Sequence, residues 1–229
     1  ATPITINEDA AYTLTEADFG FTDPSDTPAN DFQAVRISSL LANGTLTSGG
    51  SPVGPGSIVN LAAIRAQQLV FRPAADANGA GFGFTYQVQD DGGTASGGVD
   101  TDTTPRTMAI SVTAVSDPIQ GQDQSKTINE DTTYTFAAAD FPFTDVENDT
   151  LVAVKITTLP TAGTLRLNSN PVALGDEIPQ GSLGQLTYTP ATNAFGNPNP
   201  YASFTFQLRD SGGTANGGAD LDPTPNRFT

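Results

Sequence analysis

Apolar and polar residues alternate along several short stretches of this chain. The segment FGFTYQVQ at 82–89 places an aromatic or aliphatic side chain at every second position, and FTFQLR at 204–209 repeats the pattern. A period of two is typical of a β-strand that buries one face and exposes the other. Pro and Gly interrupt these stretches at short intervals, and no long stretch has a helical period. The pattern therefore predicts an all-β protein built from short antiparallel strands.

Four blocks of sequence occur twice, in the same order, so the chain contains two tandem copies of one domain. The paired blocks are 6–23 with 128–145, 34–46 with 153–165, 69–79 with 186–196, and 84–105 with 204–225. Short strands separated by turns at this spacing predict a Greek-key β-sandwich for each copy.

We expect one domain at 1–116 and a second at 117–229, joined by a linker at 114–126 that contains Pro118 and Gly121. The first copy continues after its last loop with RTMAISVTAV (106–115), whereas the second ends with PTPNRFT (223–229). We therefore expect the final strand of the second sandwich to be missing. The chain begins with Ala and shows no signal peptide, so we expect a mature or excised piece.

Composition excludes several classes of function. There are 25 acidic and 9 basic residues, giving a formal net charge of −16, so nucleic acid is an unfavourable partner. No apolar run reaches the length of about 18 residues that a membrane helix needs, and we expect no membrane insertion. The chain has no Cys and no His, which removes thiol and imidazole catalysis and the usual zinc ligands. We expect no enzyme.

The abundant oxygen ligands favour a hard cation, with calcium preferred over magnesium. Acidic residues gather at the ends of the predicted strands. In a sandwich, the loop between the second and third strands lies at the same end as the loop between the last two. We therefore expect the acids of the 145–149 loop to meet Asp210. The candidate calcium ligands are Glu8, Asp23, Asp26, Asp90, Asp117, Glu130, Asp145, Glu147, Asp149 and Asp210.

Turn formation is the alternative reading for each of these acids, because Asp bonds to nearby backbone and tolerates left-handed conformations. The glycines of DDGG (90–93) are enough to explain a tight turn there. The alternating acids of TDVENDT (144–150) are harder to explain in that way, although the first copy reads TDPSDTPAND (22–31) instead.

Several ordered motifs resemble the cadherin-like repeats of very large bacterial surface proteins. They are NED (7–9), FTD (21–23), GTL (44–46), VFRP (70–73), YQVQDDGG (86–93) and SVTAVSDP (111–118). The resemblance covers both copies and implies a cadherin/immunoglobulin-like sandwich. It also implies an adhesin exported by type I secretion, often with calcium-binding RTX repeats, although this chain contains no RTX nonapeptide.

The resemblance implies that four regions hold calcium together at a junction between repeats. Glu8, Asp145 with Glu147, Asp210 and Asp117 match these regions. The linker reads SDPIQGQD (116–123) rather than D-x-N-D-N, which implies fewer ions at each junction.

The expected function is a calcium-rigidified structural spacer of a secreted, extracellular adhesin or surface fibre, with neighbouring repeats of the same protein as its partners. One alternative is a carbohydrate-binding module that binds a cell-surface glycan, with Phe195 and Tyr201 as loop candidates. Another is a fibre subunit completed by a strand from another chain, with ATPITI (1–6) as the donor. A glycosidase that uses two carboxylates is the enzymatic alternative, and no cleft is evident for it.

Overall fold

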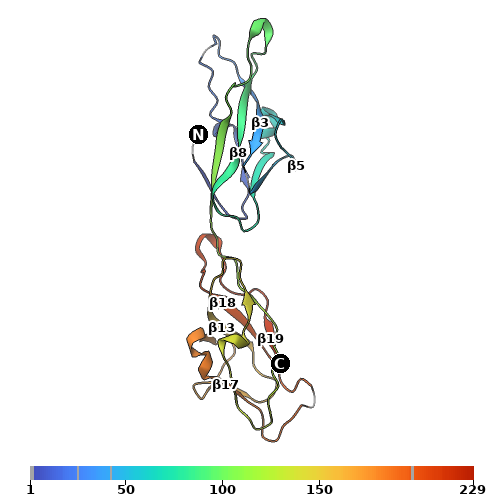
Figure 1. Ribbon diagram of the computed structural model, residues 1–229, viewed down its shortest axis with the longest axis vertical. Coiled ribbons are helices and arrows are strands. Elements are labelled where there is room, and N and C mark those ends of the chain that lie inside the picture. The colour runs from blue at the N-terminus through green and yellow to red at the C-terminus, as the bar shows by residue number, and fades with distance from the viewer. Residues whose placement is uncertain (1–2, 25, 42, 197–198) are drawn as a thin grey trace. The chain divides into compact units, whose positions relative to one another are not determined.

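The computed structural model describes residues 3–24, 26–41, 43–196 and 199–229. The chain divides into two compact units, Ala1–Ala114 and Val115–Thr229 (Figure 1). Each unit has its own hydrophobic core. Strands dominate both units, and the predicted all-β class is confirmed. In the described ranges, no helix combines the length and the apolar character that crossing a membrane requires.

The first unit is a sandwich of two sheets. One sheet has the order β1-β9-β8-β3-β6 and the other has the order β2-β7-β4-β5. Its elements are β1 (Ile4–Asn7), β2 (Tyr12–Thr13), the 3-10 helix η1 (Glu16–Phe19), β3 (Phe32–Leu40), β4 (Gly44–Ser48), β5 (Ser51–Pro52), β6 (Ile58–Asn60), α1 (Leu61–Arg65), β7 (Leu69–Pro73), β8 (Gly79–Asp90), η2 (Ala95–Gly97) and β9 (Arg106–Thr113).

The second unit repeats this plan with the sheets β16-β13-β18-β19 and β11-β17-β14-β15, and a short β10-β12 pair. Its elements are β10 (Gln120–Gly121), β11 (Tyr134–Thr135), η3 (Ala138–Asp140), β12 (Phe143–Thr144), β13 (Leu151–Thr158), β14 (Thr164–Leu167), β15 (Asn170–Pro171), β16 (Glu177–Pro179), η4 (Gln180–Gln185), β17 (Leu186–Thr189), β18 (Phe204–Asp210), η5 (Ala215–Gly217) and β19 (Asn226–Phe228).

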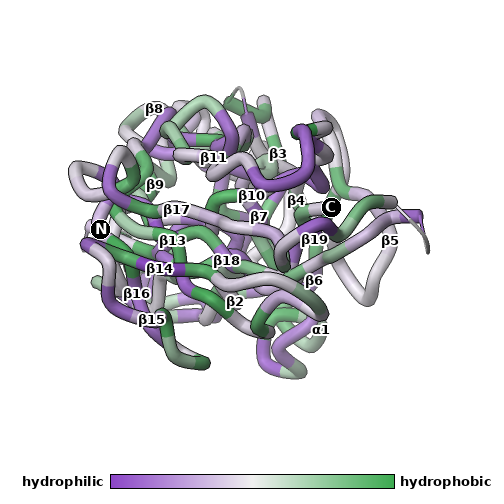
Figure 2. The backbone as a smooth tube through the Cα atoms, turned by 90° about the horizontal axis from the view of Figure 1, so that it is seen from below, coloured by the Kyte–Doolittle hydropathy of each residue, from purple (hydrophilic) through white to green (hydrophobic). Residues whose placement is uncertain are grey.

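The alternating pattern places its apolar members in the cores, as expected. Every second residue of β18 is buried, beginning with Phe204, and β8 buries Phe84 and Tyr86 while Thr85 between them is only partly buried. Along the strands the chain changes between hydrophobic and hydrophilic over short stretches (Figure 2). Burial of these apolar faces against the facing sheet is the main favourable contribution to folding.

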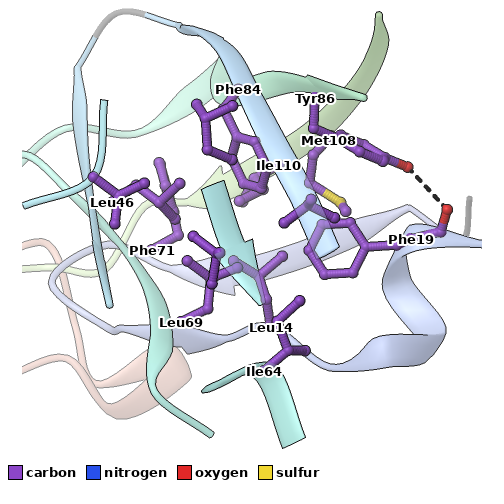
Figure 3. Packing of buried hydrophobic residues seen from close by; sticks show 14 of the residues in the cluster. Leu14, Phe19, Leu46, Ile64, Leu69, Phe71, Phe84, Tyr86, Met108 and Ile110 are labelled. Atoms are coloured by element: carbon purple, nitrogen blue, oxygen red, sulfur yellow. Dashed lines mark hydrogen bonds between the residues drawn. The ribbon is translucent and has the colours of Figure 1, made fainter. Parts of the chain in front are cut away.

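Aromatic side chains organise the core of the first unit. Phe19 packs edge-on against Tyr86, with ring centroids 5.1 Å apart (Figure 3). The buried Tyr86 hydroxyl donates a hydrogen bond of 3.2 Å to the Phe19 carbonyl oxygen. This bond satisfies the one polar group of a side chain that is 1% exposed, and it ties η1 to the sheet.

The pairing of the two central strands is the same in both units. β3 pairs antiparallel with β8, and β13 pairs in the same way with β18. Both ladders shift register near the start of β3 and β13 and again near the end of these strands, at corresponding positions. In the second unit the ladder pairs Leu151 with Asp210, which brings the loop before β13 next to the loop after β18.

The segment expected as a linker belongs structurally to the second unit. Ile119 is fully buried in the core of that unit, and β10 pairs with β12. The segment from Val115 onward, expected as a linker between the domains, is therefore part of the second unit. A single apolar residue between Pro118 and Gly121 has no periodicity, which is why the sequence did not indicate this strand.

The last strand of the second unit is short rather than missing. β19 pairs with β18 and aligns Phe204 with Phe228, just as β8 and β9 align Phe84 with Met108. β19 has three residues, whereas β9 has eight. The expectation of a missing final strand is corrected for these first three positions.

Gly83 in β8 allows a close approach between β8 and β9. Gly83 has a φ of +120°, and a Cβ there would collide with the Met108 carbonyl oxygen. Gly81 has a similar φ of +96° with open space around it. A side chain at Gly81 would therefore meet only the strain of a positive φ, whereas one at Gly83 would meet that strain and a steric collision.

We expect Gly81→Ala to destabilise the first unit by about 1–2 kcal/mol through left-handed strain alone. Gly83→Ala should cost about 1–3 kcal/mol more, because the added methyl must displace backbone. Denaturant unfolding of both variants measures the difference. Equal losses would show that the approach of β9 to Gly83 does not limit this position.

Candidate functional site

The acidic loop DVEND (145–149) of the second unit connects β12 to β13 and folds back on itself. Asn148 has a left-handed φ of +64°, which reverses the chain direction. The backbone N–H of Asp149 donates a hydrogen bond of 2.6 Å to Asp145 Oδ1. This turn brings the alternating acids together on the loop.

The side chains of Asp145, Glu147 and Asp149 come together at this turn. Each offers a carboxylate oxygen, and the three oxygens lie within 4.8 Å of one another. All three residues are partly buried. Asp145 Oδ2 is buried with no hydrogen-bond partner. A buried carboxylate oxygen without a donor is costly unless a cation or another donor reaches it.

Ser116 and Gly212 complete the surroundings of the cluster. The Ser116 hydroxyl oxygen is also buried with no hydrogen-bond partner. A Cβ on Gly212 would collide with both this hydroxyl and Asp149 Oδ2, so both atoms face the same glycine. The absence of a side chain at Gly212 therefore lets the segment before β10 approach the acidic loop. The Ser116 carbonyl oxygen accepts a hydrogen bond of 3.0 Å from Ala219 N–H, which fixes this approach.

Asp210 accepts hydrogen bonds from two backbone N–H groups beside the cluster. It is 3% exposed, and its Oδ2 accepts a hydrogen bond of 3.0 Å from Ile119 N–H. Its Oδ1 accepts a hydrogen bond of 2.9 Å from Gly212 N–H. The adjacent Ser211 hydroxyl donates a hydrogen bond of 2.9 Å to Asp149 Oδ1, so Asp210 lies beside the loop. Its two oxygens are bound to backbone donors of the second unit, and it is not a member of the three-carboxylate group. As a calcium ligand, Asp210 stays a prediction.

Glu147 has an altered proton affinity. Burial raises the pKa of the Glu147 carboxyl above its ordinary value, and the charges of Asp117 and Asp145 raise it further. The Asp117 backbone N–H donates a hydrogen bond of 3.3 Å to Glu147 Oε2 and partly opposes this rise in pKa. Burial and the neighbouring carboxylates therefore both disfavour the ionised form of Glu147.

The corresponding acids of the first unit are arranged differently. Asp23 Oδ2 accepts a hydrogen bond of 2.8 Å from Asn30 N–H, and Asp26 Oδ2 accepts one of 2.8 Å from the Asn30 side-chain amide. Asp90 Oδ1 accepts one of 2.8 Å from Gly92 N–H. Among the described residues, Asp23, Asp26 and Asp90 do not form a three-carboxylate group. These bonds agree with the turn-forming alternative, and as calcium ligands the three acids stay predictions.

Two further candidates lie elsewhere. Glu8 is 4% exposed and accepts a hydrogen bond of 3.0 Å from the Asn78 side-chain amide within the first unit. Glu130 is exposed and lines a groove at another part of the second unit. As ligands, Glu8 and Glu130 stay predictions, as does the side chain of Asp117.

Sequence reasoning missed Ser116, Gly212 and the buried Asp222. Asp222 is 3% exposed and accepts hydrogen bonds from Gly121 N–H (2.9 Å) and Thr224 N–H (2.9 Å). It thus fixes β10 to the loop before β19. The glycine of SGG (211–213) was the available signal, since the first copy also has two glycines there, but a tight turn explained it equally well.

Residues 113–221 match the family model described as bacterial Ig domain. The matched region corresponds to the second unit and agrees with its sandwich of two sheets. No curated protein sequence matches the chain.

The chain is also similar to solved structures of cadherin repeats, at low sequence identity. Human mucin-like protocadherin EC1-2 has a TM-score of 0.41 and 15% identity, over 99% of this chain and 94% of that one. Drosophila N-cadherin EC1-4 has 0.41 and 15%, over 99% of this chain and 48% of that one. Human CDH23 EC21-23 has 0.39 and 12%, over 99% and 71%. The chain thus spans about half the length of the N-cadherin structure.

The raised pKa of Glu147 predicts a pH-dependent effect of Glu147→Gln in chelator. A raised pKa in the folded state means that ionised Glu147 opposes folding above that pKa, and that the penalty disappears as the pH falls below the unfolded value of 4.5. The variant keeps an acceptor for Asp117 N–H and removes the charge. It should therefore unfold at a higher temperature than the parent at pH 7, with the gap closing towards pH 4.

Thermal unfolding of the two proteins across this pH range measures the gap. Comparing them at each pH cancels the opposing contribution of Glu177, whose pKa is lowered by the Arg209 guanidinium. A variant that is less stable than the parent at pH 7 would contradict the assigned repulsion.

Proposed function

We propose that the chain forms two structural Ig-like repeats of an extracellular adhesin or surface fibre, and that the acidic loop at 145–149 binds calcium. The buried Asp145 Oδ2, which lacks a hydrogen-bond donor, carries this proposal. It lies in a group of three carboxylates whose oxygens are within 4.8 Å of one another. A divalent cation supplies the missing positive charge.

The donor set fits calcium better than other common metals. The cluster offers carboxylate oxygens from Asp145, Glu147 and Asp149, with the Ser116 hydroxyl close to Asp149. The chain contains no His or Cys to supply nitrogen or sulfur. Calcium accepts six to eight oxygen ligands in irregular arrangements, whereas magnesium demands a near-ideal octahedron. A flexible loop of mixed carboxylates and a hydroxyl suits the less demanding ion.

The proposed role of the ion is mechanical. The segment that leads away from the first unit is held on the second from Ser116 onward, through bonds from Ala219, Ile119 and Gly121. β9 ends at Thr113, so only two residues, at 114 and 115, precede this anchored segment. Calcium beside Ser116 would stiffen the anchor and limit the swivelling of one repeat against the next.

An extracellular spacer agrees with the other observations. The tandem duplication, the match to a bacterial Ig domain and the acidic surface are expected of repeats that hold a binding domain away from a cell. Bacterial Ig-like domains are commonly extracellular, and Ig-like families are structural or adhesion modules rather than enzymes.

Calcium should raise the stability of the second unit. A dissociation constant of about 10⁻⁴–10⁻³ M is expected for an extracellular module. Calcium at about 100 times that constant should add roughly 2.7 kcal/mol to the free energy of unfolding. Asp145→Asn should remove most of this increment. Thermal unfolding in chelator and in calcium measures both effects.

Asp176→Asn is the matched control. Asp176 lies in the same unit, outside the cluster, and accepts a hydrogen bond from Ala173 N–H that an Asn oxygen can also accept. It removes one charge and should leave the calcium increment intact. Equal melting temperatures with and without calcium in the parent would eliminate calcium binding.

The mechanical role predicts a change in the distances between the two units. Ile58 and Leu174 are 62% and 66% exposed, and the chain has no Cys, so Ile58→Cys and Leu174→Cys provide clean sites for spin labels. Calcium should narrow the distribution of distances between the labels. The same labels on an Asp145→Asn background should give a broad distribution under both conditions.

An unchanged distribution, in a protein whose melting temperature does rise with calcium, would contradict the mechanical role and leave the binding site in place. The two measurements therefore test the site and its mechanical consequence separately.

A further inference from the structure

The segment 116–121 is bound to the second unit along its length, and we call it the docked segment. The side chain of Ile119 is fully buried in the core of that unit. Ile119 N–H donates a hydrogen bond of 3.0 Å to Asp210 Oδ2, and Gly121 N–H donates one of 2.9 Å to Asp222 Oδ2. One apolar side chain and two buried carboxylates thus hold the docked segment in place.

The docked segment also fixes the point where the acidic loop begins. Among the described strands, β12 pairs with β10 alone, with Gln120 opposite Thr144 and Gly121 opposite Phe143. Asp145 follows Thr144 directly in the chain. The position of Asp145 therefore depends on β10, and β10 in turn depends on the burial of Ile119 beside it.

Two further contacts join the docked segment to the carboxylates. Asp117 N–H donates a hydrogen bond of 3.3 Å to Glu147 Oε2. The Ser116 hydroxyl oxygen and Asp149 Oδ2 both lie against Gly212. The docked segment therefore forms one side of the cluster, although Ile119 itself is outside the group of three carboxylates.

The end of the acidic loop is held by a different part of the unit. The Ser211 hydroxyl donates a hydrogen bond of 2.9 Å to Asp149 Oδ1. Leu151 lies opposite Asp210 in the ladder between β13 and β18 (Figure 1). Asp149 is thus fixed by the central strands, whereas Asp145 and Glu147 take their positions with help from the docked segment.

The docked segment is also the part of the second unit that comes first along the chain after β9. Residues 114 and 115 alone separate it from the end of β9 at Thr113. β10 and β12 have two residues each, whereas β13 has eight and β18 has seven. A pull transmitted along the chain from the first unit therefore acts on the short β10-β12 pair before it reaches the long ladder.

We propose that calcium binding at the acidic loop and docking of 116–121 are coupled, so that displacement of the docked segment releases the ion. This inference rests on the calcium site proposed above. Ile119 is a positioning residue for the site, because its burial holds β10 against β12 and thereby sets Asp145. Coupling between two equilibria is reciprocal, so calcium must strengthen docking by the same factor by which docking strengthens calcium binding.

The first test measures calcium affinity by calorimetric titration of the full chain and of two variants. Ile119→Ala should weaken calcium binding by at least about fivefold, the lower end of the usual range for coupled sites. Ile178→Ala is the matched control, because Ile178 is equally buried in the same core but lies in β16, outside the docked segment and the acidic loop. It should bind calcium as the parent does.

The second test uses the unaltered chain and follows hydrogen exchange by NMR, with and without saturating calcium. Calcium should slow exchange of the Ile119 and Gly121 amides by at least about fivefold, because these amides are released only when the segment undocks. The Val172 amide, which donates to the Leu165 carbonyl oxygen in the other sheet, is the control and should be slowed less.

Each unfavourable outcome has a distinct meaning. If the parent binds no calcium, the proposed function fails and the coupling fails with it. If the parent binds calcium but the two Ile variants have equal affinities, the coupling alone is overturned. Calcium binding that leaves the Ile119 and Gly121 amides unchanged, or slows the Val172 amide as much, also overturns it. Should Ile119→Ala fail to fold, the exchange measurement on the parent decides.

Discussion

The antiparallel ladder between the two central strands of each unit is the constraint on which the rest of the structure depends. In the second unit, β13 and β18 bury one face of each strand, and this sets which residues enter the core. The same ladder ends with Leu151 opposite Asp210. The loop before one strand and the loop after the other must therefore meet, since each begins where the pairing stops. The pairing thus sets Asp210 and Gly212 beside the acidic loop, whose own turn brings the three carboxylates together.

Carboxylates have two distinct uses in this chain. Asp210 and Asp222 are almost fully buried, and backbone N–H groups surround their oxygens. Such bonds satisfy the buried carboxylate oxygens without any metal. Asp145 keeps one buried oxygen without a donor and has other carboxylates close by. The structural acids Asp210 and Asp222 thus have hydrogen-bond donors for their buried oxygens, whereas the candidate ligand Asp145 lacks one.

The sequence predicted those features that depend on periodicity and repetition. The period of two placed Phe84 and Phe206 in the cores, and the all-β class followed from it. The approach of Asp210 to the 145–149 loop was also predictable, because loop position in a sandwich depends only on strand order. The role of Asp210 was only partly predictable: its bond from Gly212 is a local turn contact, whereas its bond from Ile119 comes from a distant segment whose approach depends on tertiary packing.

The sequence did not indicate features that lack a repeating pattern, such as very short strands and single long-range contacts. β10 has two residues, and its place in the second unit depends on the burial of Ile119 rather than on any repeating pattern. The contact of Ser116 with Gly212 joins residues almost a hundred positions apart, and neither is unusual in its own stretch of sequence. Long-range contacts between ordinary residues leave little trace in a single sequence.

The contrast between the two early loops has an evolutionary consequence. In the first unit, Asn30 donates hydrogen bonds to both Asp23 and Asp26. In the second, the same position in the fold carries three crowded carboxylates. A few differences in one surface loop thus separate a repeat whose loop acids accept hydrogen bonds from Asn30 from a repeat whose loop acids crowd together, while the sandwich beneath stays the same. Gene duplication can therefore diversify the charge arrangement of successive repeats while the fold is kept.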